Sequence, residues 1–330
     1  MRPFLPSFFF LIAALILSLA IGAVFIPPAD ILRALAGVSS DGVVRTILWD
    51  IRLPRTVLIA LTGMALGGSG AAYQGLFRNP LADPYLIGIA SGAGLGAVLA
   101  MTVKWSYSFW GLMAIPLSAF AGALLTVSLV YFLARVGQTT PVTTLILAGV
   151  AISSFATSLM SFLMLRSDGE LRRAMSWLMG GAIQLGWTSV LAMLPYLILG
   201  LGTLIIHGHA LNLMQFGDEQ AQQLGLNVQR SKQIVLFASS LATAAAVSFV
   251  GIVGFIGLVV PHIMRLWFGG DYRRLIPLSI LGGSTALLIS DVIARVVIAP
   301  QELPVGIVTA LAGAPFFLWI LRRSKTQGLW

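Results

Sequence analysis

The stretch PRTVLIALTGMALGGSGAAYQG, residues 54–75, decides the fold class of this chain. After Arg55 it carries no charged side chain, and about 20 consecutive apolar residues are what an α-helix needs to cross a bilayer. Small residues recur at every fourth position, at Gly63, Gly67, Ala71 and Gly75. This spacing puts them on one helix face, where a neighbouring helix can approach closely in lipid. A second such stripe, at Gly88, Gly92 and Gly96, predicts the same kind of packing.

The rest of the chain repeats this pattern. Of 330 residues, 58% are hydrophobic and 9% are charged, and the mean hydropathy is +0.95. Soluble domains carry about 25% charged residues, so an all-α polytopic membrane protein is predicted, as one membrane domain over residues 1–330. The apolar runs predict ten helices, at 4–26, 54–75, 85–103, 108–134, 142–165, 188–206, 233–250, 255–268, 275–295 and 305–322.

The N-terminal apolar run, Phe8 to Phe25, is longer than the core of a usual signal peptide, so we favour a retained first helix. Ten crossings put both termini on one side. Counting Lys and Arg near the helix ends gives a slight excess on the side of the termini, which favours cytoplasmic termini. Many arginines then remain outside, and an acidic partner docking there is one explanation.

Several chemistries are not expected. The chain has no cysteine, and its three histidines lack the spacing of paired metal ligands, so no metal site or bound cofactor is predicted. No G-x-x-x-x-G-K-[ST] motif occurs, so any ATPase must be a separate subunit. The net charge of +9 lies in short clusters between apolar runs, which indicates membrane topology and partner contacts and not nucleic-acid binding.

The long polar segment 207–232 is predicted to be a cytoplasmic docking surface made of two short helices. Asp218 and Glu219 follow Gly217 and suit a helix N-terminus. Gly225 suits the residue that ends the same helix, and Asn227 can cap the next turn. A plain loop is the alternative, but a loop of this length with helix caps is more often functional.

Arginines mark the opposite side. Arg52 and Arg55 flank Pro54 at the start of one predicted helix, and Asp291 precedes Arg295 by four residues, a spacing that allows an ion pair across one turn. Physical reasoning leaves two interpretations equally open. The arginines either reach toward the membrane interface or present fixed cations to carboxylates of an outside partner.

Eight short motifs, in this order and membrane context, resemble the FecCD family of permeases. They are RLPRT (52–56), GLFRNPLADP (75–84), LAGVA (147–151), WLMGG (177–181), GDEQAQQLGL (217–226), GFIGLVVPHIMR (254–265), DVIAR (291–295) and ELPVG (302–306). The resemblance covers nearly the whole chain. That family includes permeases for cobalamin, ferric siderophores and haem.

The resemblance implies a homodimer in a bacterial inner membrane, with a translocation pathway along the dimer axis. It also implies two partner subunits that bind ATP and Mg inside, and one substrate-binding protein, periplasmic or lipid-anchored, outside. Arg52, Arg55 and Arg295 would meet acidic residues of that binding protein, and Thr143 and Thr144 would lie near a cytoplasmic gate. Coupling to the ATPase would fall to Gly217, Asp218, Glu219, Gln220, Ala221, Leu224, Gly225 and Leu226.

The substrate is left open between haem and ferric siderophores, with cobalamin as the third choice. Arg172 and Arg173 could help the propionates of haem to enter and Trp177 could contact a flat macrocycle, although ordinary interfacial roles explain them as well. An ion-coupled secondary transporter would want a carboxylate near the midplane, whereas Asp291 lies near a helix end. An intramembrane enzyme would want a catalytic pair, and none is seen.

Overall fold

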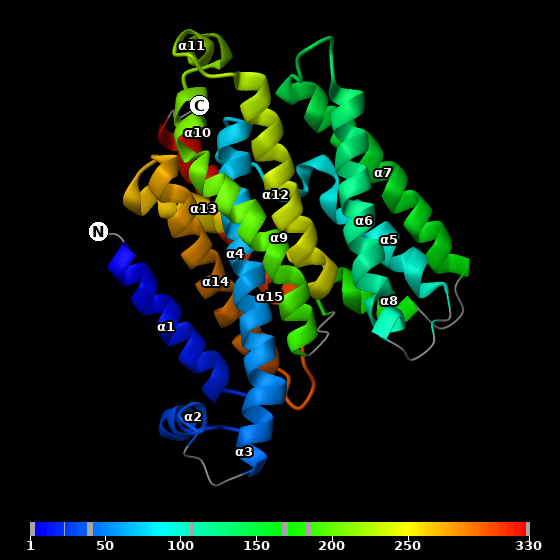
Figure 1. Ribbon diagram of the computed structural model, residues 1–330, viewed down its shortest axis with the longest axis vertical. Coiled ribbons are helices and arrows are strands. Elements are labelled where there is room, and N and C mark those ends of the chain that lie inside the picture. Colours follow the sequence, from blue (N-terminus) through cyan, green and yellow to red (C-terminus); the bar gives the residue numbers. More distant parts are fainter. Residues whose placement is uncertain are drawn as a thin grey trace.

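The protein is an all-helical bundle in the computed structural model (Figure 1), which describes residues 4–22, 24–37, 42–103, 105, 109–166, 171–181 and 186–327. The ten predicted apolar helices are confirmed. They are α1 (Phe4–Ala20), α4 (Leu53–Leu76), α5 (Ile89–Met101), α6 (Phe109–Ala134), α7 (Val142–Arg166), α9 (Trp187–Ile206), α12 (Val228–Val250), α13 (Ile256–Phe268), α14 (Tyr272–Val296) and α15 (Val305–Gln327). Within the described residues, six helical segments are long and apolar enough to cross a membrane, and the other four apolar helices are shorter.

Short helices lie at the two ends of the bundle. One end, called the α2 end below, carries α2 (Pro28–Leu35), α3 (Gly42–Thr46), the π-helical turn η1 (Ile47–Arg52) and α8 (Leu171–Leu178). The opposite end, called the α11 end, carries α10 (Gly208–Met214) and α11 (Asp218–Gln223).

Helix α4 is the axis of the bundle, with 20 of its 24 residues buried. The predicted glycine stripe explains how other helices come so close to it. A methyl group on Gly63 would lie 2.3 Å from the carbonyl oxygen of Gly283 on α14, and one on Gly67 would lie 2.1 Å from that of Ser279. The second stripe does the same between α5 and α6, where a methyl group on Gly96 would meet the carbonyl oxygen of Ser118 at 2.1 Å. Both predictions of packing through small residues are confirmed.

Helices α5 and α13 are too short to span the bilayer alone. Thirteen residues rise about 20 Å, less than the roughly 30 Å of a hydrocarbon core. Backbone that is not α-helical precedes each of them. The segment 77–88, which contains the 3-10 turn η2 (Pro84–Ile87), precedes α5, and the segment 251–255 precedes α13. These two segments are in contact: the Tyr85 hydroxyl donates a hydrogen bond to the carbonyl oxygen of Val253 at 2.9 Å. Irregular backbone is tolerated at membrane depth where protein surrounds it in this way.

Candidate functional site

The three arginines predicted to face an outside partner lie at the α2 end, but their side chains turn inward. Arg52, Arg55 and Arg295 are each at most 8% exposed. The guanidinium of Arg52 donates to the carbonyl oxygens of Leu19 at 2.5 Å and Ala20 at 3.0 Å, and also to that of Val24. Arg52 therefore fixes the end of α1 and the segment after it. Its hydrogen-bond acceptors there are backbone carbonyl oxygens and not carboxylates.

Arg55 and Arg295 share one carboxylate. Asp291, fully buried on α14, accepts from Nη2 of Arg55 at 2.9 Å. Its other oxygen lies 3.0 Å from Nε of Arg295, although that N–H is directed at the backbone carbonyl of Asp291 at 3.4 Å. The contact between the Arg295 guanidinium and this second carboxylate oxygen is therefore an ion pair without a well-directed hydrogen bond. The pair predicted across one helical turn, Asp291 with Arg295, is confirmed.

Glu302 completes this cluster from the loop before α15. Its carboxylate accepts from Nη1 of Arg55 at 2.7 Å and is 48% exposed. Arg295 also donates to the carbonyl oxygens of Ile21 and Ser18, at 2.9 and 3.1 Å. The arginine cluster, defined here as Arg52, Arg55, Asp291, Arg295 and Glu302, thus joins α1, α4, α14 and the start of α15 at one end of the bundle.

The charges of Arg55 and Arg295 already have partners within the chain, so an outside carboxylate would have to compete with Asp291 and Glu302. Arginines that are exposed at the same end are Arg33 on α2, Arg45 on α3 and Arg172 on α8. Of these, Arg33 pairs with Asp30 at 3.3 Å, and both side chains are largely in solvent.

The residues predicted for substrate entry separate into two kinds. Arg172 and Arg173 lie on the exposed side of α8. Trp177, one turn further along α8, is 4% exposed and packs in the core. A methyl group on Gly251 would come within 2.2 Å of the Trp177 carbonyl oxygen, so the backbone is also tightly enclosed. In this structure the indole has no free face for a macrocycle.

At the α11 end, the polar segment forms one of the two predicted short helices, α11, and also the short helix α10, which was not predicted. Helix α11 begins at Asp218 after Gly217, and Gly225 follows its C-cap residue Leu224 with φ +87°. Asn227 accepts from the backbone N–H of Arg230 at 3.0 Å, but the helix it caps is α12 itself and not a separate turn. The predicted start of α11, with Asp218 and Glu219 in its first turn, is confirmed, although neither side chain caps it. The separate second turn is wrong, because Asn227 caps α12, which starts five residues earlier than predicted.

The residues predicted for coupling lie on two faces of the α11 region, one buried against the bundle and one exposed. Ala221 is fully buried, and Asp218 forms ion pairs with Lys232 and, at 3.4 Å, with Arg78. The opposite face is exposed at Glu219, Gln220, Gln222, Gln223, Leu224 and Gly225. Leu224 is 62% exposed and Phe216, just before α11, is 65% exposed. Two large apolar side chains on a polar surface outside the bundle are typical of a docking contact.

Hydrogen bonds connect this end to the long helices. The amide of Asn212 on α10 donates to Asp271 at 2.6 Å, and its oxygen accepts from the backbone N–H of Tyr272 at 2.8 Å. Asp271 in turn caps α14, and hydrogen bonds from Arg273 and Asn212 lower the pKa of its carboxyl to about 2. Arg265 on α13 bridges Gln74 on α4 and Tyr272, each at 3.1 Å. These hydrogen bonds link α10 to the start of α14 directly and, through Tyr272 and Arg265, to α13 and α4.

The two threonines predicted near a gate lie at the start of α7, on the α11 side. The Thr144 hydroxyl is 2.8 Å from the carbonyl oxygens of Ala134 and Pro141, whereas Thr143 is exposed. Their role in gating stays a prediction. Sequence reasoning missed Glu302 and Asn212 as contributors. The motif ELPVG contains Glu302, but no local pattern signals that it meets Arg55, 247 residues away.

Comparison with known proteins agrees with this architecture. The model of the FecCD transport family matches residues 10–323. The hemin transport system permease HmuU of Yersinia pestis is 41% identical over 301 residues, covering 89% of each chain. The cobalamin import system permease BtuC of Halobacterium salinarum is 44% identical over 285 residues, covering 86% of this chain and 76% of that one.

A solved structure described as an inward-facing metal-chelate type ABC transporter superposes with a TM-score of 0.86 at 29% identity, covering 98% of this chain and 99% of that one. The helices, their order and nearly the full length of the chain are thus shared with this group. The chain belongs to the FecCD transport family and is the membrane-spanning permease subunit of an ABC transporter, a subunit distinct from the ATPase.

Proposed function

We propose that this permease imports an iron complex, haem or a ferric siderophore, which an external binding protein delivers and which passes by alternating access. The observation that carries the proposal is the position of α11. It stands outside the bundle, exposes Phe216 and Leu224, and is tied by Asp218 to α12. A partner that hydrolyses ATP and seats on α11 would move these helices as one body, and packed interfaces turn small shifts into discrete openings.

The α11 end is accordingly proposed to face the cytoplasm, together with both termini. The α2 end would receive the binding protein. Docking on Arg52, Arg55 and Arg295 would require a carboxylate of the partner to replace Glu302 on Arg55, since Glu302 is the exposed member of the cluster. The exposed Arg45 and Arg172 supply positive charge away from Asp291 and Glu302, and rim charges of this kind speed association.

We also propose a homodimer built on α7, with the pathway at its axis. Helix α7 has few buried residues for an apolar helix, and it exposes large side chains such as Leu147, Phe155 and Leu165, which is 87% exposed. Thr143 and Thr144 at its α11 end would lie near the gate. Arg172 and Arg173 at the α2 end would meet the carboxylates of an entering haem.

Cobalamin is the alternative cargo, supported by the relative from Halobacterium salinarum. An ion-coupled secondary transporter has less support. Such a transporter needs a carboxylate that binds and releases its coupling ion, whereas Asp291 lies between two guanidinium groups. The substrate binding mode, in any of these cases, would depend on shape more than on charge.

Transport in liposomes tests the proposal. The purified permease is reconstituted with its ATPase and its binding protein, and uptake of haem, a ferric siderophore and cobalamin is measured with and without ATP. ATP-dependent uptake of an iron complex is expected, only when both partners are present. Uptake by the permease alone would refute the mechanism, and uptake of cobalamin alone would correct the cargo.

A further inference from the structure

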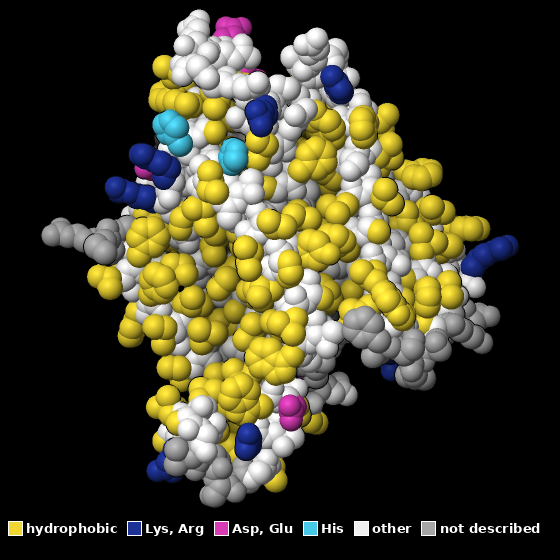
Figure 2. Space-filling view, in the orientation of Figure 1, with side chains coloured by type: hydrophobic (Ala, Val, Ile, Leu, Met, Phe, Trp, Pro, Cys, Tyr) yellow, Lys and Arg dark blue, Asp and Glu magenta, His cyan; other side chains and the backbone are white. Residues whose placement is uncertain are grey.

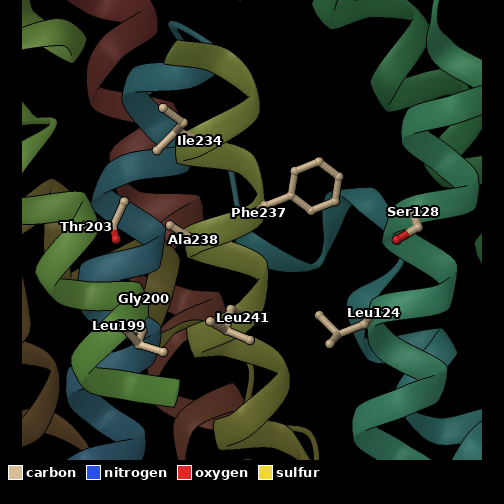
Figure 3. Close-up of a pocket in the computed structure, with 9 residues that line it drawn as sticks. All are labelled: Leu124, Ser128, Leu199, Gly200, Thr203, Ile234, Phe237, Ala238 and Leu241. Carbon is tan, nitrogen blue, oxygen red and sulfur yellow. The ribbon is translucent and has the colours of Figure 1, made fainter. Parts of the chain in front are cut away.

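An apolar groove crosses the side of the bundle between α6, α9 and α12. It has a volume of about 390 Å³, within the range of roughly 300–1,000 Å³ of small-ligand sites. Figure 3 shows Phe237 and Leu241 projecting from α12 toward Leu124 and Ser128 on α6, while α9 forms the other wall. This α6 groove is lined by Leu124, Ser128, Leu199, Gly200, Thr203, Ile234, Phe237, Ala238 and Leu241.

The groove exists because α6 and α9 separate toward the α11 end. They touch through Phe120 and Tyr196, whose ring centroids are 4.8 Å apart. Further along, α6 instead contacts α12, where the rings of Tyr131 and Phe237 lie 5.5 Å apart. Helix α9 stays close to α12, because a methyl group on Gly200 would come within 2.8 Å of the Ala238 carbonyl oxygen. The space between α6 and α9 is therefore framed by aromatic contacts and built into the fold.

The lining selects a hydrocarbon ligand. Seven of its nine members are apolar side chains or glycine, and the other two are the hydroxyl-bearing Ser128 and Thr203. The surrounding surface is also apolar (Figure 2), with Leu125 on α6 70% exposed and Leu199 on α9 62% exposed. Side chains of this kind, on helices that cross the membrane, face acyl chains. The groove therefore opens to lipid and not to a water-soluble ligand.

Basic residues continue the groove beyond its α11 end. Arg230 lies one turn before Ile234 on α12, and His207 lies one turn after Thr203 on α9, so each shares a helix face with a lining residue. Arg135 follows Ser128 by seven residues, two turns along the line of α6. Both arginines are exposed, and neither guanidinium has a carboxylate partner among the residues the structure describes.

The distance from the last lining residues of the groove to these basic residues matches the thickness of the headgroup region of one leaflet. Four residues of helix rise about 6 Å and seven about 10 Å, so the cations lie roughly 6–10 Å beyond the last lining residues. The polar region of one leaflet is about 5–8 Å thick. An acyl chain in the groove would thus place its phosphate at the level of Arg230 and Arg135.

We propose that the α6 groove is a binding site for an anionic glycerophospholipid of the leaflet on the α11 side. One acyl chain occupies the groove, and the phosphate and anionic headgroup bind Arg230 and Arg135, with the His207 imidazole at the edge. The lipid fills the space between α6 and α9 that opens beyond the contact of Phe120 with Tyr196. The site is independent of which cargo the permease carries.

Photo-crosslinking of lipid tests this site directly. The full chain is reconstituted in vesicles of equimolar phosphatidylcholine and phosphatidylglycerol, with a photoactivatable acyl chain on one or the other lipid. Cross-links to the lining residues are then mapped by mass spectrometry. Phosphatidylglycerol is expected to label the groove in preference to phosphatidylcholine, whereas Leu125, on the open side of α6, is expected to be labelled by both alike.

Variants separate the headgroup from the groove. Each of Arg230→Gln and Arg135→Gln should weaken phosphatidylglycerol labelling about 5-fold, since a basic residue near the surface contributes about 1 kcal/mol to binding an anionic lipid. Arg274→Gln, an exposed arginine on the same side but on α14, is the matched control and should change nothing. Ser128→Trp should block the groove and reduce labelling by both lipids there, and Leu125→Trp should not.

Three results would overturn the proposal. Equal labelling by both lipids that is insensitive to the arginine variants would mean ordinary bulk lipid. No labelling of the lining residues would mean that the groove is closed in the membrane. Weaker ATPase assembly in the arginine variants with lipid labelling unchanged would assign Arg230 and Arg135 to the ATPase contact, and that outcome would leave the proposed transport function standing.

Discussion

Arg55 on α4 and Asp291 on α14 form an ion pair inside the protein, with Nη2 and Oδ1 2.9 Å apart and the carboxylate fully buried. The pair joins helices whose sequences are separated by 236 residues. Arg295 lies on the other side of the same carboxylate. One buried anion thus offsets two cations. Its removal leaves Arg55 with the half-exposed Glu302 alone and Arg295 with no carboxylate partner among the residues the structure describes.

Asp291→Asn is expected to destabilise the protein by about 3–5 kcal/mol, because removing one partner of a buried pair leaves an uncompensated charge. Thermal unfolding of the purified protein in detergent measures this loss as a lower midpoint. Glu302→Gln is the matched control, since its side chain is 48% exposed and exposed pairs contribute about 0–1 kcal/mol. Equal effects of the two substitutions would show that Asp291 is not a buried anchor.

Gly63→Ala is expected to destabilise the bundle by about 1–3 kcal/mol, the usual cost of overpacking. The added methyl group would lie 2.3 Å from a backbone oxygen of α14, which cannot move aside as a flexible side chain would. Gly202→Ala on α9 is the control, because nothing lies within 4 Å of the added methyl group. It should stabilise slightly, by about 0.4–1 kcal/mol. A neutral Gly63→Ala, measured by the same unfolding midpoint, would contradict the close approach of α4 and α14.

The ten apolar helices were predictable because a bilayer fixes the length and composition of whatever crosses it. The short helices were not. Helices α2 and α8 are amphipathic pieces of eight residues each, and they carry no long apolar run to reveal them. Helix α1 ends at Ala20, six residues before the predicted end. The sequence stays apolar beyond Ala20, but the guanidinium of Arg52 donates hydrogen bonds to the carbonyl oxygens of Leu19, Ala20 and Val24.

The arginine cluster shows which part of a site a sequence can reveal. Asp291 and Arg295 are four residues apart on one helix, so their pairing follows from helix geometry alone. The contacts of Arg55 with Asp291 and Glu302 depend on how α4, α14 and the loop before α15 come together. No local pattern contains that arrangement. The sequence therefore identified the arginines, but whether they faced outward or inward required the folded chain.

Asp271 predicts a dependence of stability on acid. Its folded pKa, about 2, lies below the ordinary aspartate pKa of 3.8 because Arg273 and Asn212 donate hydrogen bonds to the carboxylate. A carboxyl group whose pKa is lower in the folded than in the unfolded protein stabilises the fold at pH values above its unfolded pKa. That contribution is lost as pH falls from about 4 toward 2. Since the Asp271 side chain is 34% exposed and solvent screens its interactions, the effect should not exceed about 1 kcal/mol.

Asp271→Asn isolates this charge, because asparagine is also a good N-cap for α14. The unfolding midpoint of the variant should lie below that of the original protein near neutral pH, and the two should converge in acid. A difference that stays constant down to about pH 2 would show that the lost hydrogen-bond geometry, and not the charge of the carboxylate, is responsible.

Leu224→Ala and Phe216→Ala are expected to weaken assembly with the ATPase subunit while leaving the fold intact. Both side chains are more than 60% exposed beside α11, so the truncation removes little buried surface from the permease itself. If they are central contacts of the partner, each truncation should reduce the binding free energy by about 2 kcal/mol, which is roughly a 30-fold rise in Kd.

Leu32→Ala on α2, 69% exposed at the opposite end, is the matched control and should bind normally. The measurement is the affinity of the detergent-purified permease for its ATPase. Unchanged affinity in both α11 variants would remove the case for α11 as the coupling helix, because no other pair of large apolar side chains projects from that segment, 207–232, of the described chain.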